Sequence, residues 1–255
     1  MFNLLFPKTV YSTYDNGNLL SVVDDGSAFV FKFNSIVYSK LPKKEVFTHQ
    51  YWDYFLPAAY AAYDASEGEK EKILIIGLGG GTLVHLLSHT SNKTEIDAVE
   101  LSSKVAEIAK RFLPKEDIAN TNIIIADGFD YLSSVPSASY NAVFLDAYYK
   151  DKIPQQFLTT EFVSLAAKAL KYKGILAVNF AMTFMGFVAY EKYTKLLKQK
   201  FNVYHANTAI TEGNTILVCA KGMQKNEIVE KIKSRMEYNK DTALLIRSYE
   251  NMKEA

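Results

Sequence analysis

The sequence is poor in the residues that most directly indicate a function. It contains one cysteine, four histidines and six prolines among 255 residues. The lone Cys219 cannot form an internal disulfide, and no Cys/His cluster has the spacing of a zinc site. Lys and Arg (29) balance Asp and Glu (28), for a formal net charge of +1. This balance argues against a protein that depends on a broad basic field, so we expect no nucleic-acid partner.

Long apolar runs are also missing. The longest uncharged stretch, residues 174–190, contains Asn179 and Thr183 and is shorter than the roughly 20 residues that a membrane-spanning helix needs. It is more typical of a strand followed by a helix. The first residues lack the basic start and apolar run of a signal peptide. We therefore expect a cytoplasmic protein with no membrane partner.

Apolar and aromatic residues are abundant, and their patterning divides the chain into four segments. Hydrophobic residues make up 49% of the chain, enough for a large core. In residues 1–45, turn signals at 15–18 (DNGN) and 24–26 (DDG) separate runs rich in β-branched and aromatic residues, which predicts a small antiparallel β domain. Residues 46–71 predict an aromatic-rich helix over 47–64, kinked or restarted at Pro57, and a polar linker.

Residues 72–222 alternate between buried strands and helices. Five strands are predicted at 72–77, 94–100, 122–127, 140–146 and 174–180, and such alternation indicates a parallel, doubly wound sheet. Two further strands, 201–207 and 214–220, have only a short turn between them and must pair antiparallel. The expected fold is therefore α/β, with a mainly parallel seven-stranded sheet whose last pair is antiparallel. Residues 223–255 predict a charged helical extension packed on the outside.

A glycine-rich turn links the first strand of this sheet to its helix. Glycines in Gly77-Leu78-Gly79-Gly80-Gly81 permit a tight turn, and the helix that follows offers free N–H groups to a ligand. A dinucleotide G-x-G-x-x-G starting at Gly77 would need glycine at Thr82, so the spacing fits G-x-G-x-G instead. No Lys-Ser/Thr pair follows, which excludes a phosphate-binding P-loop.

Acidic residues end the next two strands. Glu100, followed by Leu101, could accept hydrogen bonds from both ribose hydroxyls, and Asp127, followed by Gly128, could accept one from the exocyclic amine of adenine. Taken singly, each acid is equally typical of a helix cap. Three polar strand ends in series favour a nucleoside pocket, and the antiparallel end of the sheet is typical of the class I, S-adenosylmethionine (AdoMet) methyltransferase-like fold. The predicted cofactor-binding residues are Gly77, Gly79, Gly81, Glu100, Leu101, Asp127 and Gly128.

From about Val10 to about Phe180 the chain resembles the spermidine synthase (polyamine aminopropyltransferase) family. KILIIGLGGGTLVHLL and IDAVELSSKVAEIAKRFL are similar to that family's nucleoside-binding half, IIIADGFDYL to its adenine-contacting segment, and YNAVFLDAYYKDKIPQQFL to its catalytic strand and loop. The resemblance implies transfer of an aminopropyl group from decarboxylated AdoMet to a diamine. It also implies a homodimer, since the family's β domain often mediates oligomers.

The chain departs from the family pattern where the diamine would bind. In the family's D-x-x-D-P loop only the first acid is present, as Asp146, and the second position is Tyr149. The glycine loop lacks the family's acid that holds the aminopropyl ammonium, and the family's Tyr-His/Gln-Glu is Thr-His-Gln at 48–50, of which only His49 matches. Losing these acids weakens binding of a polycation and removes repulsion against the carboxylate of intact AdoMet. We therefore expect AdoMet as the cofactor, with decarboxylated AdoMet as the alternative.

Candidate residues at the acceptor side each have a structural alternative. We favour Asp146 as a base or acceptor-orienting carboxylate over a loop cap. Tyr148 and Tyr149 are assigned to an acceptor pocket, although surface aromatics are equally consistent with the pattern. His49 is assigned to the methionine end of the cofactor, with a helix-capping role nearly as consistent. Asn179 fits a strand-end cap better than a substrate contact.

His85 and His89 lie four residues apart on one predicted helix, a spacing that could suit a metal. Because no third ligand is visible in the sequence, we expect a packed or solvated pair and no metal.

The leading functional hypothesis is an AdoMet-dependent transferase on a spermidine synthase-like scaffold that methylates an unidentified small-molecule acceptor. One alternative is an aminopropyltransferase that uses decarboxylated AdoMet and a polyamine. A second alternative is a non-catalytic nucleoside-binding or scaffold protein.

Overall fold

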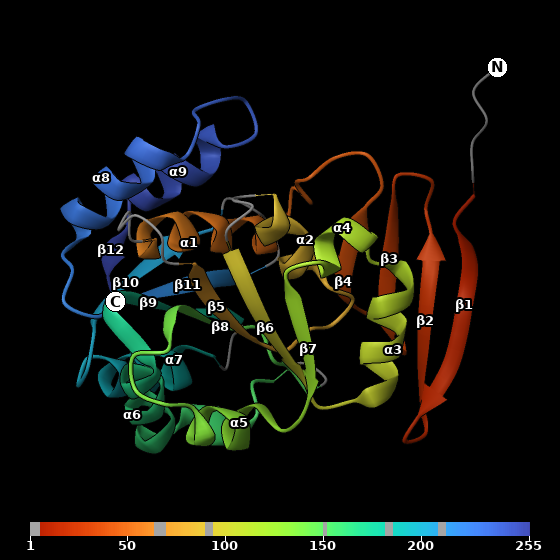
Figure 1. Ribbon diagram of the computed structural model, residues 1–255, viewed down its shortest axis with the longest axis horizontal. Helices are drawn as coiled ribbons and strands as arrows, with labels where there is room; N and C mark the ends of the chain where they lie inside the picture. Colours follow the sequence, from red (N-terminus) through yellow and green to blue (C-terminus); the bar gives the residue numbers. More distant parts are fainter. Residues whose placement is uncertain (1–5, 64–69, 90–93, 150–151, 182–185, 209–212) are drawn as a thin grey trace.

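The computed structural model describes residues 6–63, 70–89, 94–149, 152–181, 186–208 and 213–255. Its N-terminal part is a four-stranded antiparallel sheet in the order β1-β2-β3-β4, on the right in Figure 1. The strands are β1 (Lys8–Asp15), β2 (Asn18–Asp24), β3 (Ala28–Phe33) and β4 (Ile36–Pro42). Asn16 and Gly17 both have positive φ (48° and 78°), as the tight turn between β1 and β2 requires.

The second sheet has the order β12-β10-β11-β9-β8-β5-β6-β7. Strands β5 to β9 are parallel to their neighbours in this group, and β11 pairs antiparallel with both β9 and β10. The strands are β5 (Glu71–Ile76), β6 (Thr94–Glu100), β7 (Thr121–Ile125), β8 (Tyr140–Leu145), β9 (Leu170–Ala181), β10 (Asn202–Asn207), β11 (Asn214–Ala220) and β12 (Lys253–Glu254). The predicted doubly wound α/β fold with an antiparallel end is thus confirmed.

Two predictions about this sheet need correction. Within the described part of the chain it has eight strands rather than seven, because the two residues of β12 pair with Tyr204 and His205 of β10. The C-terminal extension is therefore not wholly helical. A two-residue strand carries no periodicity and could not be recognised from its sequence.

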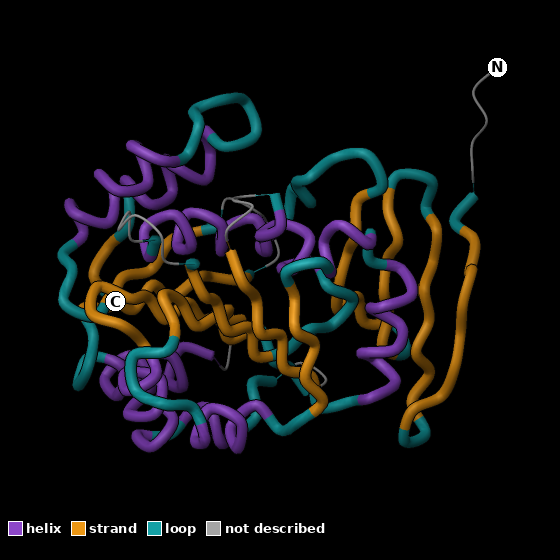
Figure 2. Tube along the Cα trace, viewed as in Figure 1, coloured by secondary structure: helices purple, strands orange, loops and turns teal. Residues whose placement is uncertain are grey.

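Helices cover both faces of the second sheet (Figures 1 and 2). They are α1 (Leu56–Ala62), α2 (Thr82–Ser88), α3 (Ser103–Phe112), α4 (Lys115–Ile118), α5 (Gly128–Ser134), α6 (Thr160–Ala169), α7 (Gly186–Leu197), α8 (Lys225–Arg235) and α9 (Ala243–Glu250). Side chains of β5 alternate between the faces: Ile73 and Ile75 join the core of α1, α2 and α3, whereas Leu74 and Ile76 join that of α5, α6 and α7. Among the described helices, none has the length and apolarity needed to cross a membrane.

The helix predicted over 47–64 is shorter and divided. A 3₁₀ helix, η1 (Tyr51–Phe55), precedes α1, and Pro57 lies in the first turn of α1, where its missing N–H costs nothing. The helix begins late because the buried Asp53 carboxylate accepts hydrogen bonds from the backbone N–H groups of Thr48 and His49. These bonds hold a turn in which His49 has a φ of 55°.

The parallel strands end at one edge of the sheet, which we call the carboxyl edge. Ile76 at the end of β5 is in register with Val99 of β6 and with Leu145 of β8, and Glu100 is in register with Ile125 of β7. The residues that follow these strands therefore lie side by side. In open α/β sheets ligands bind at this edge.

Candidate active site

The glycine loop (residues 77–81) and the turn after β8 are pressed together at the carboxyl edge. Gly77 has a φ of 98°, and a Cβ at this position would lie 2.6 Å from the backbone oxygen of Asp146. The N–H of Asp146 donates to the backbone oxygen of Ile76 (3.0 Å). Only glycine fits at position 77, and its absent side chain is what lets Asp146 approach the loop.

The N-terminal sheet covers the middle of the glycine loop. A Cβ on Gly80 would lie 2.6 Å from the ring of Phe31 on β3. A side chain at this position would displace the aromatic ring, so the loop cannot carry an acid here without rearrangement of β3.

Glu100 is fixed by the backbone around it. Its Oε2 accepts from the N–H of Gly79 (3.2 Å) and its Oε1 from the N–H of Ser102 (2.9 Å). Burial raises the pKa of Glu100, and these backbone donors oppose the rise. The structure thus joins Glu100 to the glycine loop, and a nucleoside contact by either stays a prediction. The neighbouring Leu101 is exposed (71%).

Asp127 is the N-cap of α5, the helix-cap role that the sequence analysis gave as the alternative to an adenine contact. Its carboxylate accepts from the N–H groups of Phe129 (2.8 Å) and Asp130 (3.2 Å). It also accepts from Nε2 of Gln156, 2.9 Å from Oδ2, a partner that the sequence analysis missed. Gly128 is tightly enclosed, since a Cβ there would meet the side chain of Ile76. An adenine contact by Asp127 stays a prediction.

Asp146 follows β8 at this edge, and side chains from two other elements donate to its carboxylate. Its Oδ1 accepts from Nδ2 of Asn179 (2.8 Å), and its Oδ2 accepts from Nε1 of Trp52 (3.0 Å). The Oδ1 of Asn179 in turn accepts from Nδ2 of Asn214 (2.7 Å), which fixes the amide so that its NH₂ faces Asp146. Burial raises the pKa of Asp146 from 3.8 to about 7, and the two donors lower it only in part.

From the sequence, Asn179 fits a strand-end cap better than a substrate contact, and Trp52 falls within the predicted aromatic-rich helix. The structure places both against Asp146, from β9 and η1 respectively. Trp52 is 94 residues from Asp146 in the chain, so no local pattern could connect them. For Asn179, its place at the end of a predicted strand was the available signal.

The two tyrosines of the predicted acceptor pocket have different environments. The Tyr148 hydroxyl donates to the backbone oxygen of Asn179 and accepts from the N–H of Ala181, both at 3.0 Å, and burial raises its pKa. Tyr148 therefore stabilises the backbone at the end of β9. Tyr149 is exposed (62%), and its backbone pairs with Lys152. Acceptor contacts by either residue stay a prediction.

His49 lies in the turn before η1, and its side chain is largely exposed. Its Nε2 lies 3.4 Å from Oε2 of Glu45. Within the described residues, the Asp146 contact from this part of the chain comes from Trp52. A cofactor contact by His49 stays a prediction.

These residues suit the adenosine end of an adenosyl sulfonium donor better than they suit an aminopropyl ammonium at its other end. The glycine loop and Glu100 offer a close backbone approach and a carboxylate acceptor, which suit an adenosine. Asp146 offers a carboxylate that can take up a proton near neutral pH. At Gly80, where the family places an acid for the aminopropyl ammonium, the ring of Phe31 leaves no room for a side chain.

Sheet order and glycine loop together define a Rossmann-like domain of the class I methyltransferase type. Within that class, the family described as "Spermine/spermidine synthase domain" matches residues 61–231. This match covers more than half of the chain, and the chain belongs to this family of transferases.

Individual relatives agree with the family match. The chain is 32% identical over 111 residues to a polyamine aminopropyltransferase of Vibrio vulnificus. The aligned residues make up 43% of this chain and 37% of that protein. The alignment thus spans about a third of the length of the relative. The chain is also similar to a human eEF1A lysine and N-terminal methyltransferase, with 26% identity over 158 residues. This alignment covers 58% of this chain and 22% of the human protein.

Among solved structures, the spermidine synthase of Thermotoga maritima has the same fold. The TM-score is 0.70 at 19% identity, with 95% of this chain and 84% of the other chain covered. The resemblance inferred from the sequence motifs is therefore confirmed for both family and fold.

Proposed function

We propose that this chain is an aminopropyltransferase of the spermidine synthase type, which joins the propylamine group of decarboxylated AdoMet to an amine acceptor. The family match and its aminopropyltransferase relatives support this alternative over the methyl transfer that we expected from the sequence. The observation that carries the proposal is Asp146, a carboxylate at the end of β8 with a pKa of about 7.

Asp146 suits the proton transfer that such a reaction requires. The donor supplies an alkyl carbon activated by the adjoining sulfonium. The acceptor amine forms the new C–N bond with its lone pair as the C–S bond breaks, and the nitrogen must lose a proton. A carboxylate with a pKa near 7 is a stronger base than an ordinary aspartate and remains substantially ionised at neutral pH.

Trp52 and Asn179 are positioning residues in this proposal. Each donates a hydrogen bond to a different oxygen of Asp146, so they fix the carboxylate plane and favour its ionised form. Glu100 and the glycine loop would hold the adenosine of the donor.

Methyl transfer from intact AdoMet is the second candidate. It is favoured by the lack of an acid at Gly80 and by Tyr149 in the place of the family's second aspartate. Both departures weaken recognition of ammonium groups, and neither opposes the carboxylate of AdoMet.

A donor comparison tests the proposal. Purified full-length protein is titrated with AdoMet and with decarboxylated AdoMet by calorimetry, and products from a panel of mono-, di- and polyamines are identified by mass spectrometry. We expect tighter binding of the decarboxylated donor and an aminopropylated amine that Asp146→Asn fails to make. The matched control is Asp130→Asn, which removes an exposed carboxylate from α5 and should leave turnover unchanged.

Tighter binding of AdoMet together with a methylated product would contradict aminopropyl transfer and support methyl transfer, the second candidate. Donor binding without any product would favour the non-catalytic alternative. Failure to bind either donor would contradict all three hypotheses.

A further inference from the structure

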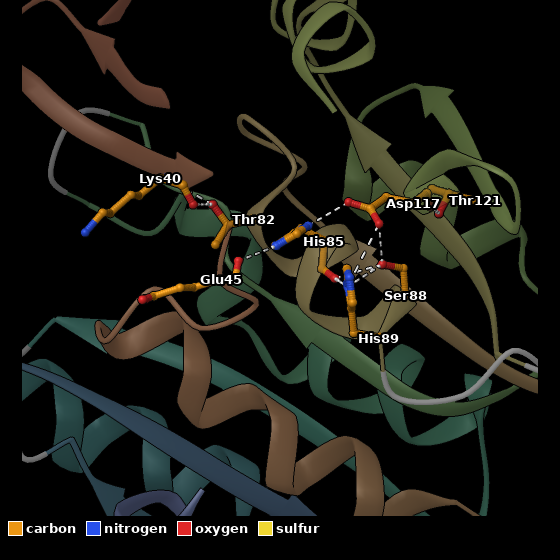
Figure 3. A network of polar contacts seen from close by, with 8 residues as sticks. All are labelled: Lys40, Glu45, Thr82, His85, Ser88, His89, Asp117 and Thr121. Atoms are coloured by element: carbon orange, nitrogen blue, oxygen red, sulfur yellow. Dashed lines mark hydrogen bonds and ion pairs between the residues drawn. The ribbon is translucent and has the colours of Figure 1, made fainter. Parts of the chain in front are cut away.

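His85 of α2, the residue that caps its C-terminal end, His89, and Asp117 of α4 lie close together (Figure 3). His85 Nδ1 lies 2.7 Å from Asp117 Oδ2, and His89 Nδ1 lies 3.9 Å from Asp117 Oδ1. One possible ligand atom from each residue lies within 4.8 Å of the other two. Asp117 is the third residue that the sequence analysis could not find, because it follows His89 by 28 positions and reaches the cluster only through the fold.

The surroundings of His85 resemble those of an imidazole metal ligand. Its second ring nitrogen, Nε2, lies 3.3 Å from the backbone oxygen of Glu45. Histidines that bind metals almost always donate their other N–H to a carbonyl or carboxylate, which fixes the tautomer and the ring orientation. Nδ1 of His85 faces Asp117 and is hydrogen-bonded to its Oδ2 at 2.7 Å, so a metal ion would take the place of the proton between these two atoms.

Asp117 is oriented in the same manner. Its side chain is 1% exposed, and its Oδ1 accepts from the hydroxyl of Ser88 (2.7 Å) while Thr121 Oγ1 donates to its backbone oxygen (3.0 Å). His89 by contrast is 41% exposed, at the C-terminal end of α2. Nδ1 of His89 lies 2.8 Å from the backbone oxygen of His85, so metal binding through this atom requires that contact to break. The cluster thus has two buried, oriented ligands and a third, more exposed one that must turn.

Space for a further ligand lies beside the cluster. A cavity of ≈ 160 Å³ is lined by His89 and Asp117 together with Ser88, Thr94, Ile96, Glu116 and Asn120. Its volume exceeds that of several water molecules, each of which occupies about 30 Å³ in the liquid. The polar lining can supply hydrogen bonds to a metal-bound water.

We propose that His85, His89 and Asp117 bind one divalent transition-metal ion, with zinc as the best fit, and that water from the adjoining cavity completes the coordination. Two imidazoles and a carboxylate are a ligand set that zinc accepts, and bonds of about 2.0–2.1 Å in a tetrahedron place ligand atoms about 3.3 Å apart. The possible ligand atoms of the three residues lie within 4.8 Å of one another, so a bound metal would draw them closer together.

This metal would act on the structure and not on the transfer reaction. It joins the C-terminal end of α2 to α4, and through Glu45 to the segment that follows β4. The other end of α2 follows the glycine loop directly, since Gly81 is its N-cap. A metal at the cluster would hold the helix on which the loop depends.

Metal content and thermal stability test the site. Full-length protein without a histidine tag is treated with a chelator, dialysed against micromolar zinc chloride, and analysed by inductively coupled plasma mass spectrometry. We expect about one zinc per chain. Zinc at about one hundred times its Kd should raise Tm by about 5–10 °C. Cobalt(II) should give visible absorption bands of a tetrahedral site.

Variants of two histidines assign the binding to the cluster. His89→Ala should weaken zinc binding at least tenfold, and its exposed side chain makes loss of folding a minor risk. His205→Ala is the matched control, since His205 lies on β10 and its Nδ1 contacts the hydroxyl of Tyr190. The inference would be overturned by wild-type protein that retains no zinc. Equal binding by wild type and His89→Ala, or equal losses in the two variants, would overturn it as well.

Discussion

Replacing Asp146 with asparagine should abolish the pH dependence of stability that this residue contributes. In the folded protein burial raises the pKa of this carboxyl from 3.8 to about 7, so the folded state holds the proton more tightly than the unfolded chain does. The stability that the protonated group contributes is therefore lost as the pH rises from about 4 to about 7. Asparagine does not titrate, so the variant lacks this loss.

The size of the effect follows from the two pKa values. Between about pH 5.5 and about pH 8.5 the wild-type protein should lose about 2 kcal/mol of unfolding free energy through Asp146 alone. Asparagine retains one acceptor and places its NH₂ against one of the two donors, Trp52 or Asn179, at a cost of about 1–3 kcal/mol. This cost is the same at every pH, and it cancels when the two proteins are compared across the range.

Urea denaturation of both proteins at several pH values measures the difference. We expect the stability of Asp146→Asn relative to wild type to increase by about 2 kcal/mol from the acidic to the alkaline end. In the transfer assay the same variant should lose a factor of about 10²–10⁴ in kcat if the carboxylate is the base. A relative stability that stays constant across the range would refute the raised pKa, and unchanged turnover would refute the catalytic assignment.

Three further substitutions examine the same edge of the sheet. Gly77→Ala should lower the free energy of unfolding, measured by urea denaturation, by about 2 kcal/mol or more, because its Cβ would meet the backbone of Asp146. Gly17→Ala is the control and should lower it less, because Gly17 also has a positive φ but a Cβ there would have nothing within 4 Å. Trp52→Phe removes a donor that favours the ionised form of Asp146, so the apparent pKa in the pH–rate profile should rise by about 1, and an unchanged profile would contradict this role. Tyr149→Asp restores the second acid of the family's loop and should raise kcat/KM for a diamine at least tenfold if the reaction is aminopropyl transfer; under methyl transfer, diamine turnover should not increase.

Local sequence predicted those parts of the molecule that local chemistry determines. Strand and helix alternation identified the parallel sheet, and the spacing of Gly77, Gly79 and Gly81 identified the loop that approaches Asp146 and Glu100. The residues that could not be predicted reach the site across the fold: Trp52 comes from η1 to touch Asp146. Such contacts depend on packing between segments that are distant in the sequence. Periodicity and turn signals predict only local structure, so they do not predict these contacts.

The same distinction explains why the three acids at the carboxyl edge differ in what they indicate. Glu100 and Asp127 accept hydrogen bonds from backbone N–H groups next to them in the chain, so each has a structural role that would retain it without a ligand. Asp146 has no such role in the described residues: its donors are the side chains of Trp52 and Asn179, both neutral, and its burial costs the folded state free energy at neutral pH. A carboxylate that lowers stability and is nevertheless oriented by two dedicated donors is better explained by chemistry than by folding. Among the candidate residues, Asp146 is therefore the strongest basis for the proposed function, whereas Glu100 and Asp127 lie at the ends of strands further along the same edge of the sheet.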